Sequence, residues 1–324
     1  MNRFLAAAAF CAMALAACSG GGSEGGQAAG GDAITVGFSQ VGAESEWRTA
    51  NTRSVKEALA APEFRLKFSD AQQKQENQIK ALRSFIAQKV DVIAFSPVVE
   101  SGWETVLREA KAAGIPVVLT DRAVKVSDQS LYATLIGSDF VEEGRRAARW
   151  LIDDSQGTAG PIRVAELQGT VGSAPANDRM RGFKEVIEGD SRFQVVRSQS
   201  GDFTRAKGKE VMEAFLKAEN NRIDVLFAHN DDMAIGAIQA IEEAGLKPGQ
   251  DIRIVSIDGV RGAFEAMKAG KLNATVECNP LLGPQLAQII RDVHAGRPVE
   301  KRVQVEEGVF TRDQAAAELP NRKY

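Results

Sequence analysis

"DVIAFSPV" (residues 91–98) decides the fold, because the chain repeats it as "DVLFAHND" (residues 224–231). Each stretch opens with an aspartate, continues with an apolar run and ends in small or polar residues. The segments that follow also correspond, as "LREAKAAG" (107–114) and "IQAIEEAG" (238–245). A continuous apolar run between helices of ten or more residues is typical of a parallel strand covered on both faces. We therefore predict an α/β protein with two duplicated halves.

The alternation of strand and helix extends outward from these stretches. The first half starts at "ITVGFSQV" (34–41) and closes at "VVLTD" (117–121), and the second closes at "IVSID" (254–258). Residues 270–293 add a short strand and a helix after the second half is complete. The chain is therefore expected to cross back to the first half, which predicts several hinge strands rather than one linker.

We expect two doubly wound parallel-sheet lobes joined by these hinge strands. The predicted N-terminal lobe comprises residues 33–137 and 279–307, and the predicted C-terminal lobe comprises residues 138–278 and 308–324. A chain of 324 residues with 44% hydrophobic and 26% charged residues is long enough for two such lobes with a real core.

The composition excludes several classes of function. A formal net charge of −3 gives no electrostatic case for nucleic-acid binding. The three cysteines, at positions 11, 18 and 278, form no CxxC pair, and the chain has two histidines, His229 and His294. A zinc site is therefore not expected, and no other metal or cofactor is. Cys278 is predicted to be an inert buried thiol near the hinge.

The N-terminal segment reads as a targeting signal. Residues 1–17 contain Arg3, a short apolar run and small residues, the pattern of a secretory signal peptide. "LAAC" (15–18) is typical of a lipoprotein signal with lipid on Cys18, and cleavage after "ALA" (14–16) is the alternative. The glycine-rich residues 18–32 are predicted to be a flexible tether. We expect a periplasmic protein whose contact with the membrane is through Cys18.

Polar and aromatic residues follow the predicted strands of both halves. Asp121 and Asp258 occupy equivalent places, each at the carboxyl end of a strand. In open α/β sheets ligands bind outside these ends, so two facing halves would form one cleft. The residues expected to bind the ligand in this cleft are Glu44, Trp47, Arg48, Asp121, Arg122, Arg179, Phe203, Asn230 and Asp258.

The chemistry of these residues favours a neutral polyol. A carboxylate accepts a hydrogen bond from a hydroxyl while a guanidinium donates one to its oxygen. We expect Trp47 to stack on a sugar ring, and Asn230 to face the ligand while Asp231 or Asp232 caps the following helix. "QGTVGSAPA" (168–176) lacks the glycine spacing of a phosphate cradle.

The sequence does not favour an enzyme. Asp121 and Asp258 could in principle act as the two carboxyl groups of a glycosidase. Arginines beside or opposite both favour ionised carboxylates, however, rather than an acid with a raised pKa. We therefore predict a binding protein and not an enzyme.

Several long segments resemble a known family, the periplasmic sugar-binding proteins of bacterial ABC transporters, in the ribose-binding type. The segments are "VGFSQVGAESEWR" (36–48), "DAQQKQENQIKALRSFIAQ" (70–88), "VAELQGTVG" (164–172), "RSQSGDFTRAKGKEVMEAFLKAENN" (197–221), "AHNDDMAIGAIQAIEEAGLKPG" (228–249) and "SIDGV" (256–260). The resemblance implies a periplasmic binding protein fold of type I. The loop with Glu44, Trp47 and Arg48 is similar to that of the galactofuranose-binding type within this family.

The resemblance also implies roles and partners. The positions that match sugar-contacting residues of the family are Asp121, Arg122, Arg179, Phe203, Asn230 and Asp258. "VECNP" (276–280) departs from the glutamine common at the last hinge strand, and Glu277 or Asn279 is expected to serve instead. The implied partners are a monosaccharide and an ABC permease with a separate ATPase, and the implied state is a monomer.

Alternatives from other classes stay open at this point. The same lobes could belong to a sugar sensor for a chemoreceptor or a sensor kinase. The sugar could be ribose, arabinose or galactopyranose in place of a galactofuranose-like one. A LacI-type repressor shares this core, but the signal peptide and the lack of a helix-turn-helix sequence argue against it.

Overall fold

The computed structural model describes residues 33–324, so the predicted signal peptide, tether and Cys18 lie outside the described residues. Two six-stranded sheets organise this part of the chain. The first contains, in order across the sheet, β11 (Arg302–Gln304), β5 (Thr134–Gly137), β4 (Val117–Thr120), β3 (Val92–Phe95), β1 (Ile34–Gln40) and β2 (Phe64–Asp70). The second contains, in order, β12 (Val309–Thr311), β10 (Ala274–Glu277), β9 (Arg253–Asp258), β8 (Val225–Ala228), β6 (Ile162–Gln168) and β7 (Phe193–Ser200).

Both sheets share one strand order, which confirms the predicted pair of doubly wound halves. The chain-order pattern second–first–third–fourth–fifth appears in each, with a switch point beside β1 and beside β6. All pairings are parallel except that of β10 with β12, which is antiparallel. Each sheet with its covering helices is called a lobe below. Within residues 33–324, no helix combines the length and the apolar character needed to cross a membrane.

The duplicated aspartates explain how the central strands start. Asp91 precedes β3 and accepts a hydrogen bond from the backbone N of Thr35 (2.7 Å), which ties β3 to β1. Asp224 precedes β8 and does the same with the backbone N of Arg163 (2.7 Å) at β6. The four residues of β3 and the four of β8 are all buried. The quoted repeat therefore builds the central strand of each sheet and fixes its register.

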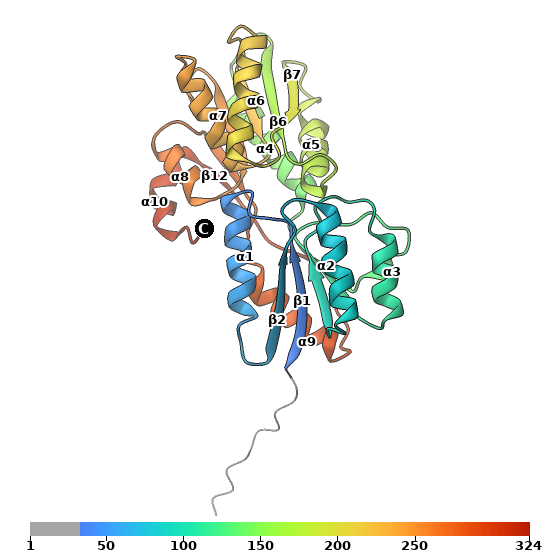
Figure 1. Cartoon of the computed structure of the whole chain (residues 1–324). Coiled ribbons are helices and arrows are strands. Elements are labelled where there is room, and N and C mark those ends of the chain that lie inside the picture. Colours follow the sequence, from blue (N-terminus) through green and yellow to red (C-terminus); the bar gives the residue numbers. More distant parts are fainter. Residues whose placement is uncertain (1–32) are drawn as a thin grey trace, which may run out of the picture. The chain divides into compact units, whose positions relative to one another are not determined.

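Helices cover both sheets, and two of them are exchanged between lobes. The first lobe carries α1 (Glu46–Ala58), α2 (Gln75–Ala87), α3 (Glu104–Ala112) and α9 (Gly283–His294). The second carries α4 (Phe140–Asp154), α5 (Ala174–Ile187), α6 (Arg205–Ala218), α7 (Asp231–Glu243), α8 (Arg261–Lys268) and α10 (Arg312–Glu318). Figure 1 shows the late helix α9 lying with α1 and β1, which come from the beginning of the described chain.

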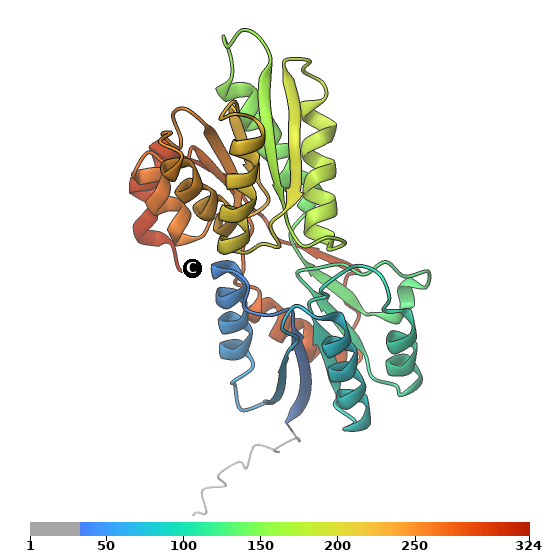
Figure 2. The same cartoon turned by 45° about the horizontal axis from the view of Figure 1, so that its top comes forward.

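The chain crosses between the lobes three times. It leaves the first sheet after β5 to form α4, which packs on α5 and β9. It returns after β10 to form α9, which packs on α1 and β3. It crosses again between β11 and β12, which belong to different sheets. Figure 2 shows these connections converging between the lobes. The predicted residue boundaries of the lobes remain a prediction.

Candidate functional site

A cavity lies at the strand ends between the two lobes. The empty space among its lining atoms, including the part that opens to solvent, is about 290 Å³. The lining residues are Glu44, Ser45, Trp47, Arg48, Asp121, Arg122, Pro175, Arg179, Phe203, Asn230, Asp258 and Cys278. Nine of the ten residues predicted to bind the ligand therefore lie around this cavity, and Asn279 does not.

The lobes touch around the cavity. The backbone N of Glu46 donates to Asp232 Oδ2 across the interface (2.8 Å). Asn177 Nδ2 donates to Glu100 Oε2 (2.6 Å), and the backbone N of Glu100 donates to the carbonyl of Gly172 (2.9 Å). These contacts join residues on opposite lobes, so the structure is a closed conformation with the cavity inside it.

The start of α1 delivers the first aromatic wall. Ser45 is the N-cap, and its Oγ accepts from the backbone N of Arg48 (3.1 Å), which satisfies an amide left free by the helix. Trp47 and Arg48 consequently occupy the first turn, where the strand end meets the cavity. Trp47 Nε1 donates to the carbonyl of Cys278 (2.6 Å), and the Arg48 guanidinium lies 4.6 Å from the centre of the indole ring. The indole is thus fixed as a wall.

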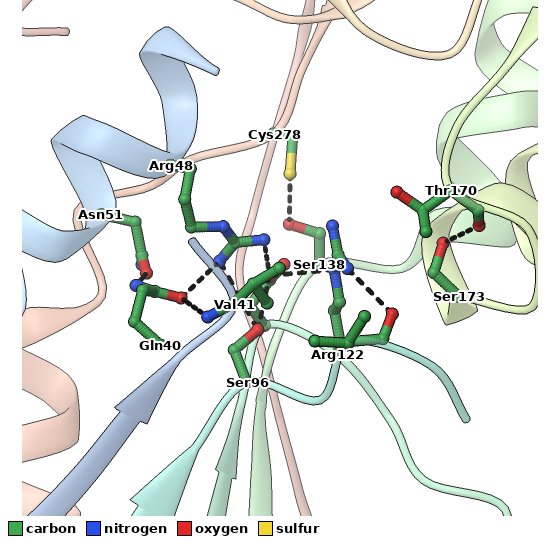
Figure 3. Close-up of polar contacts among 12 residues, drawn as sticks. Gln40, Val41, Arg48, Asn51, Ser96, Arg122, Ser138, Thr170, Ser173 and Cys278 are labelled. Atoms are coloured by element: carbon green, nitrogen blue, oxygen red, sulfur yellow. Dashed lines mark hydrogen bonds and ion pairs between the residues drawn. The ribbon is translucent and has the colours of Figure 1, made fainter. Parts of the chain in front are cut away.

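Arg48 is held by two carboxylates of the first lobe and by the side chain of Gln40, and Figure 3 shows the contact with Gln40. Its Nη2 donates to Asp121 Oδ2 (2.7 Å), its Nε to Glu44 Oε1 (3.0 Å) and its Nη1 to Gln40 Oε1 (3.2 Å). Burial disfavours the charged form, but Asp121 and Glu44 outweigh it and hold the pKa of Arg48 above its usual value. This guanidinium is charged and rigidly placed before any ligand binds.

Arg122 is less well paired. Its Nη1 donates to the carbonyl of Val98 (3.1 Å), while the two carboxylates of this lobe are 3.7 and 3.8 Å away, beyond hydrogen-bond length. Burial, and then repulsion from Arg48, lowers the pKa of Arg122 to about 10. Arg122 Nε and Glu44 Oε2 are buried without a hydrogen-bond partner. Buried polar atoms are almost always paired, so two such atoms without a hydrogen-bond partner beside one cavity are unusual.

Phe203 forms the opposite wall. It comes from the second lobe, is 3% exposed, and lies 5.3 Å from the Arg122 guanidinium and 6.0 Å from that of Arg179. Its ring packs directly over Gly169, where even a Cβ would lie 1.8 Å from the ring. A flat face with cations at its edges buries the apolar side of a ring while leaving polar groups for hydroxyls.

Arg179 and Asp258 form the polar side of the second lobe. Arg179 Nε donates to Glu143 Oε2 (2.7 Å), and its Nη1 donates to the carbonyl of His229 (2.6 Å). The Nη2 atom lies 3.6 Å from Asp258 Oδ1. Burial raises the pKa of Asp258 well above its usual value, and Arg179 offsets only part of this. The direction of this pKa shift is opposite to the one expected from the neighbouring arginines alone.

The equivalence of the two strand-end aspartates extends to their backbones. Asp121 has φ of 64° and Asp258 has φ of 137°, in the region that residues with a side chain rarely adopt. Both side chains are buried, each residue being 4% exposed. Such strain clusters at binding sites, where the surrounding fold over-determines the geometry. Each lobe therefore turns its strand-end carboxyl group into the cavity at some conformational cost.

Asn230 has a role that the sequence analysis assigned to its neighbours. It is the N-cap of α7, since its Oδ1 accepts from the backbone N of Met233 (3.0 Å), and its Nδ2 donates to the carbonyl of Phe203 (3.1 Å). The expectation that Asp231 or Asp232 caps this helix is wrong. Asp231 instead accepts from the backbone N of Gly259 (2.7 Å), which shapes the turn after β9. Asn230 thus lines the cavity with an amide that is already hydrogen-bonded.

The second crossing differs from the sequence-based expectation. Asn279 Oδ1 accepts from the backbone N of Leu281 (2.9 Å), and Glu277 accepts from Arg322 Nη1 (2.9 Å) and the Tyr324 hydroxyl (3.0 Å). Cys278, between them, lines the cavity instead. Residues 277 and 279 lie on one face of an extended chain and 278 on the other. That alternation is the pattern from which the place of Cys278 could be predicted. No comparable pattern in the sequence marks Ser45 and Pro175 as cavity residues.

The assembled site matches a small neutral ligand. The guanidiniums of Arg48, Arg122 and Arg179 are balanced by the carboxylates of Glu44 and Asp121 and by Glu143 behind Arg179. No excess charge is left for a phosphate or a carboxylate ligand. Donors and acceptors alternate around the cavity, and two aromatic faces flank them.

Comparison with known proteins agrees with this geometry. Residues 36–297 match the family model described as periplasmic binding protein domain. The chain is 51% identical over 293 residues to the galactofuranose-binding protein YtfQ of Escherichia coli K12, covering 90% of this chain and 92% of that protein.

Solved structures give the same result. A Mycobacterium smegmatis protein in complex with β-D-fucofuranose is 55% identical with a TM-score of 0.88, covering 90% of this chain and 96% of that one. The binding protein component of the arabinose ABC transporter of Shewanella sp. ANA-3, bound to α- and β-L-arabinofuranose, is 55% identical with a TM-score of 0.86, covering 89% and 95%. The resemblance and the non-enzymatic function predicted from the sequence are confirmed, and this chain belongs to the periplasmic binding protein family.

Proposed function

We propose that this protein captures one neutral monosaccharide in its furanose form, galactofuranose or a close relative, between its two lobes and delivers it to an ABC permease. The observation that carries the proposal is the cavity between the lobes, in which guanidiniums and carboxylates are matched. Relatives at 51–55% identity that bind galactofuranose, fucofuranose or arabinofuranose support the ring form. These three sugars differ in their exocyclic groups and share the five-membered ring.

Six of the predicted site residues have the following roles in the proposal. Trp47 and Phe203 hold the two faces of the sugar ring, and Arg48 with Asp121 binds hydroxyls from the first lobe. Arg122 and Glu44 supply the two unpaired atoms on that side. Because both lobes contact the sugar only when they are closed, the sugar stabilises the closed conformation.

The cellular setting is also a proposal. The protein is exported to the periplasm by residues 1–17, and Cys18 carries a lipid to which residues 18–32 tether the lobes. The closed, sugar-loaded monomer docks on the permease, and a separate ATPase supplies the energy. Support comes from the signal sequence and from the transporter relatives.

Two isomeric polyols test the ring form. 1,4-Anhydrogalactitol is locked as a five-membered ring and 1,5-anhydrogalactitol as a six-membered ring, and they have the same atoms and no anomeric hydroxyl. We expect the five-membered isomer to raise Tm and to bind at least 10-fold more tightly by calorimetry, since a ligand specific for the folded state must stabilise it. Equal or reversed affinities would overturn the furanose assignment.

Free sugars then rank the ligands. D-galactose, D-fucose and L-arabinose present a minor furanose fraction at equilibrium, and D-ribose is the comparison from the wider family. We expect the first three to stabilise the protein more than ribose does at equal concentration. No shift with any of these sugars or with either polyol would remove the proposed function as a whole.

A further inference from the structure

Glu143 is a buried carboxylate that the cavity does not expose. It lies on α4, which follows the first crossing, and it is 1% exposed. Its Oε2 accepts the hydrogen bond from Arg179 Nε at 2.7 Å. A charge in this position is costly unless it is paired with good geometry, so its presence calls for a specific task.

Arg179 reaches the cavity with one nitrogen only. Nε is occupied by Glu143 and Nη1 by the carbonyl of His229 (2.6 Å). The remaining Nη2 faces Asp258 Oδ1 across 3.6 Å, which is too long for a hydrogen bond. A donor and an acceptor thus lie close to each other without forming a hydrogen bond. One hydroxyl could donate to Asp258 and accept from Arg179 in that gap.

The first lobe shows the alternative arrangement. There Arg48 Nη2 donates directly to Asp121 Oδ2 at 2.7 Å, so that arginine and that aspartate satisfy each other. Among residues 33–324, Glu143 and Asp258 are the two carboxylates within 4 Å of the Arg179 guanidinium. If Glu143 did not hold Nε, the guanidinium would turn to Asp258 and form the same kind of direct pair.

Close packing of α4 on α5 fixes the position of Glu143. A Cβ on Gly144 would lie 2.2 Å from the carbonyl of Arg179, and a Cβ on Gly182 would lie 1.9 Å from the carbonyl of Val141. The two backbones are therefore in contact on both sides of the Glu143–Arg179 pair. Glu143 cannot follow the guanidinium if it moves.

We propose that Glu143 is a positioning residue for sugar binding, which holds Arg179 away from Asp258 so that both groups bind the same sugar hydroxyl. The inference rests on the proposed function, in which Arg179 and Asp258 contact the sugar. It gives Glu143 two roles, which are to orient the Arg179 guanidinium and to balance its charge, and substitutions can separate these roles.

Two substitutions at Glu143 separate the orienting role from the charge-balancing role. Glu143→Gln removes the charge but keeps an oxygen acceptor at the same reach. Its amide nitrogen would replace Oε1, which lacks a hydrogen-bond partner. One carboxylate oxygen of Glu143 lies within 4.8 Å of Cys278 Sγ and of a Glu307 oxygen. Glu143→Asp keeps the charge but is one methylene shorter, so it must release the guanidinium or draw it away from the cavity.

Affinity for the tightest-binding polyol, measured by calorimetry, gives the result. We expect Glu143→Gln to bind within about 3-fold of wild type and Glu143→Asp to bind about 10- to 100-fold more weakly, the range that one hydrogen bond to a charged group spans. If Glu143 only balances charge, the order reverses, with Gln weak and Asp near wild type. Either that reversal or wild-type affinity in both variants overturns the proposal.

The Asp258→Asn background supplies the second readout. With an amide at 258 the direct ion pair cannot form, so adding Glu143→Asp should cost less than 3-fold; full additivity contradicts the proposal. Glu142→Asp, the matched change at the neighbouring residue of α4, should leave the affinity unchanged. If the wild type binds no polyol or sugar, the proposed function fails and this inference with it. If the wild type binds and the variants do not differ, the inference alone fails.

Discussion

Asp121 and Asp258 lie at equivalent strand ends, but their carboxyl groups differ in how well the protein supplies them with hydrogen-bond partners. Asp121 Oδ2 accepts from Arg48 Nη2 at 2.7 Å and from Ser96 Oγ at 3.0 Å, so it is part of the folded framework. Asp258 has Arg179 at 3.6 Å, and burial raises its pKa. One carboxyl group is satisfied before the ligand binds and the other is not.

This difference predicts different consequences for the two alanine substitutions. Asp121→Ala leaves the buried Arg48 short of a partner and should lower the free energy of unfolding without sugar by about 2 kcal/mol. Asp258→Ala should change that free energy by less than about 1 kcal/mol. Both should weaken sugar binding by roughly 2–4 kcal/mol. Urea unfolding and calorimetry measure the two quantities. Equal losses of stability, or wild-type binding in both, would contradict the assignment.

Strand-end residues could be predicted from the sequence because apolar runs show where strands end. Asp121 and Asp258 follow this rule directly, whereas Arg48 and Arg179 lie on the helices that come after β1 and β6. Glu143 could not be predicted, because it reaches the site from behind, across a helix contact that no local pattern shows. Cys278 is buried as predicted, but its place in the cavity lining could not be predicted from side-chain polarity, because Glu277 and Asn279 on either side are the more polar residues.

The three crossings meet at one side chain. Glu307, between β11 and β12, accepts hydrogen bonds at Oε1 from the Ser138 hydroxyl in the first crossing and from the backbone N of Asn279 in the second (2.8 Å). Its own carbonyl accepts from Arg146 on α4. The carboxyl group of Glu307 therefore ties together segments far apart in the sequence.

Burial, followed by repulsion from Glu143, raises the pKa of Glu307 to about 8 from an unfolded value near 4.5. A raised folded pKa means that the folded state binds more protons than the unfolded state between these values. The contribution to stability is therefore fully present below pH 4.5 and is lost as pH rises through about 8, at a slope of at most about 1.4 kcal/mol per pH unit.

Glu307→Gln should remove this slope, because the amide does not titrate. We expect the free energy of unfolding to fall more steeply for the wild type than for Glu307→Gln between pH 5 and 8, with urea titrations at each pH as the measurement. Glu306→Gln, the exposed neighbour, should keep the wild-type slope. Parallel profiles for wild type and Glu307→Gln would show that Glu307 is ionised throughout this range.

The repeated central elements could be predicted because both copies carry the same aspartate and the same apolar run. Helix α4 and the short strands β5, β11 and β12 were not predicted individually. The two pairs β5–α4 and β10–α9 are themselves equivalent, since each helix leaves its own sheet to cover the other. Sequence patterns give the period of an element but not the lobe on which it packs.

Closure brings together groups that do not touch the sugar. Asn177 Nδ2 donates to Glu100 Oε2 at 2.6 Å, and the two residues lie on different lobes. Because this hydrogen bond requires the closed conformation, it adds to the stability of that conformation whatever the ligand. The cavity residues, in contrast, are proposed to distinguish one sugar from another.

Removing the Asn177–Glu100 hydrogen bond should therefore weaken sugar binding without changing the selectivity among sugars. We expect Asn177→Ala to raise Kd by about 3- to 10-fold, the worth of one hydrogen bond, and by the same factor for the tightest and the weakest ligand. Calorimetry with both ligands measures this. Glu109→Ala, which breaks the Arg83–Glu109 pair within the first lobe, is the matched control and should leave both affinities unchanged. A loss of affinity for only one of the two ligands would mean that Asn177 contacts the sugar itself. A contact that only stabilises the closed conformation affects every ligand through the same population shift.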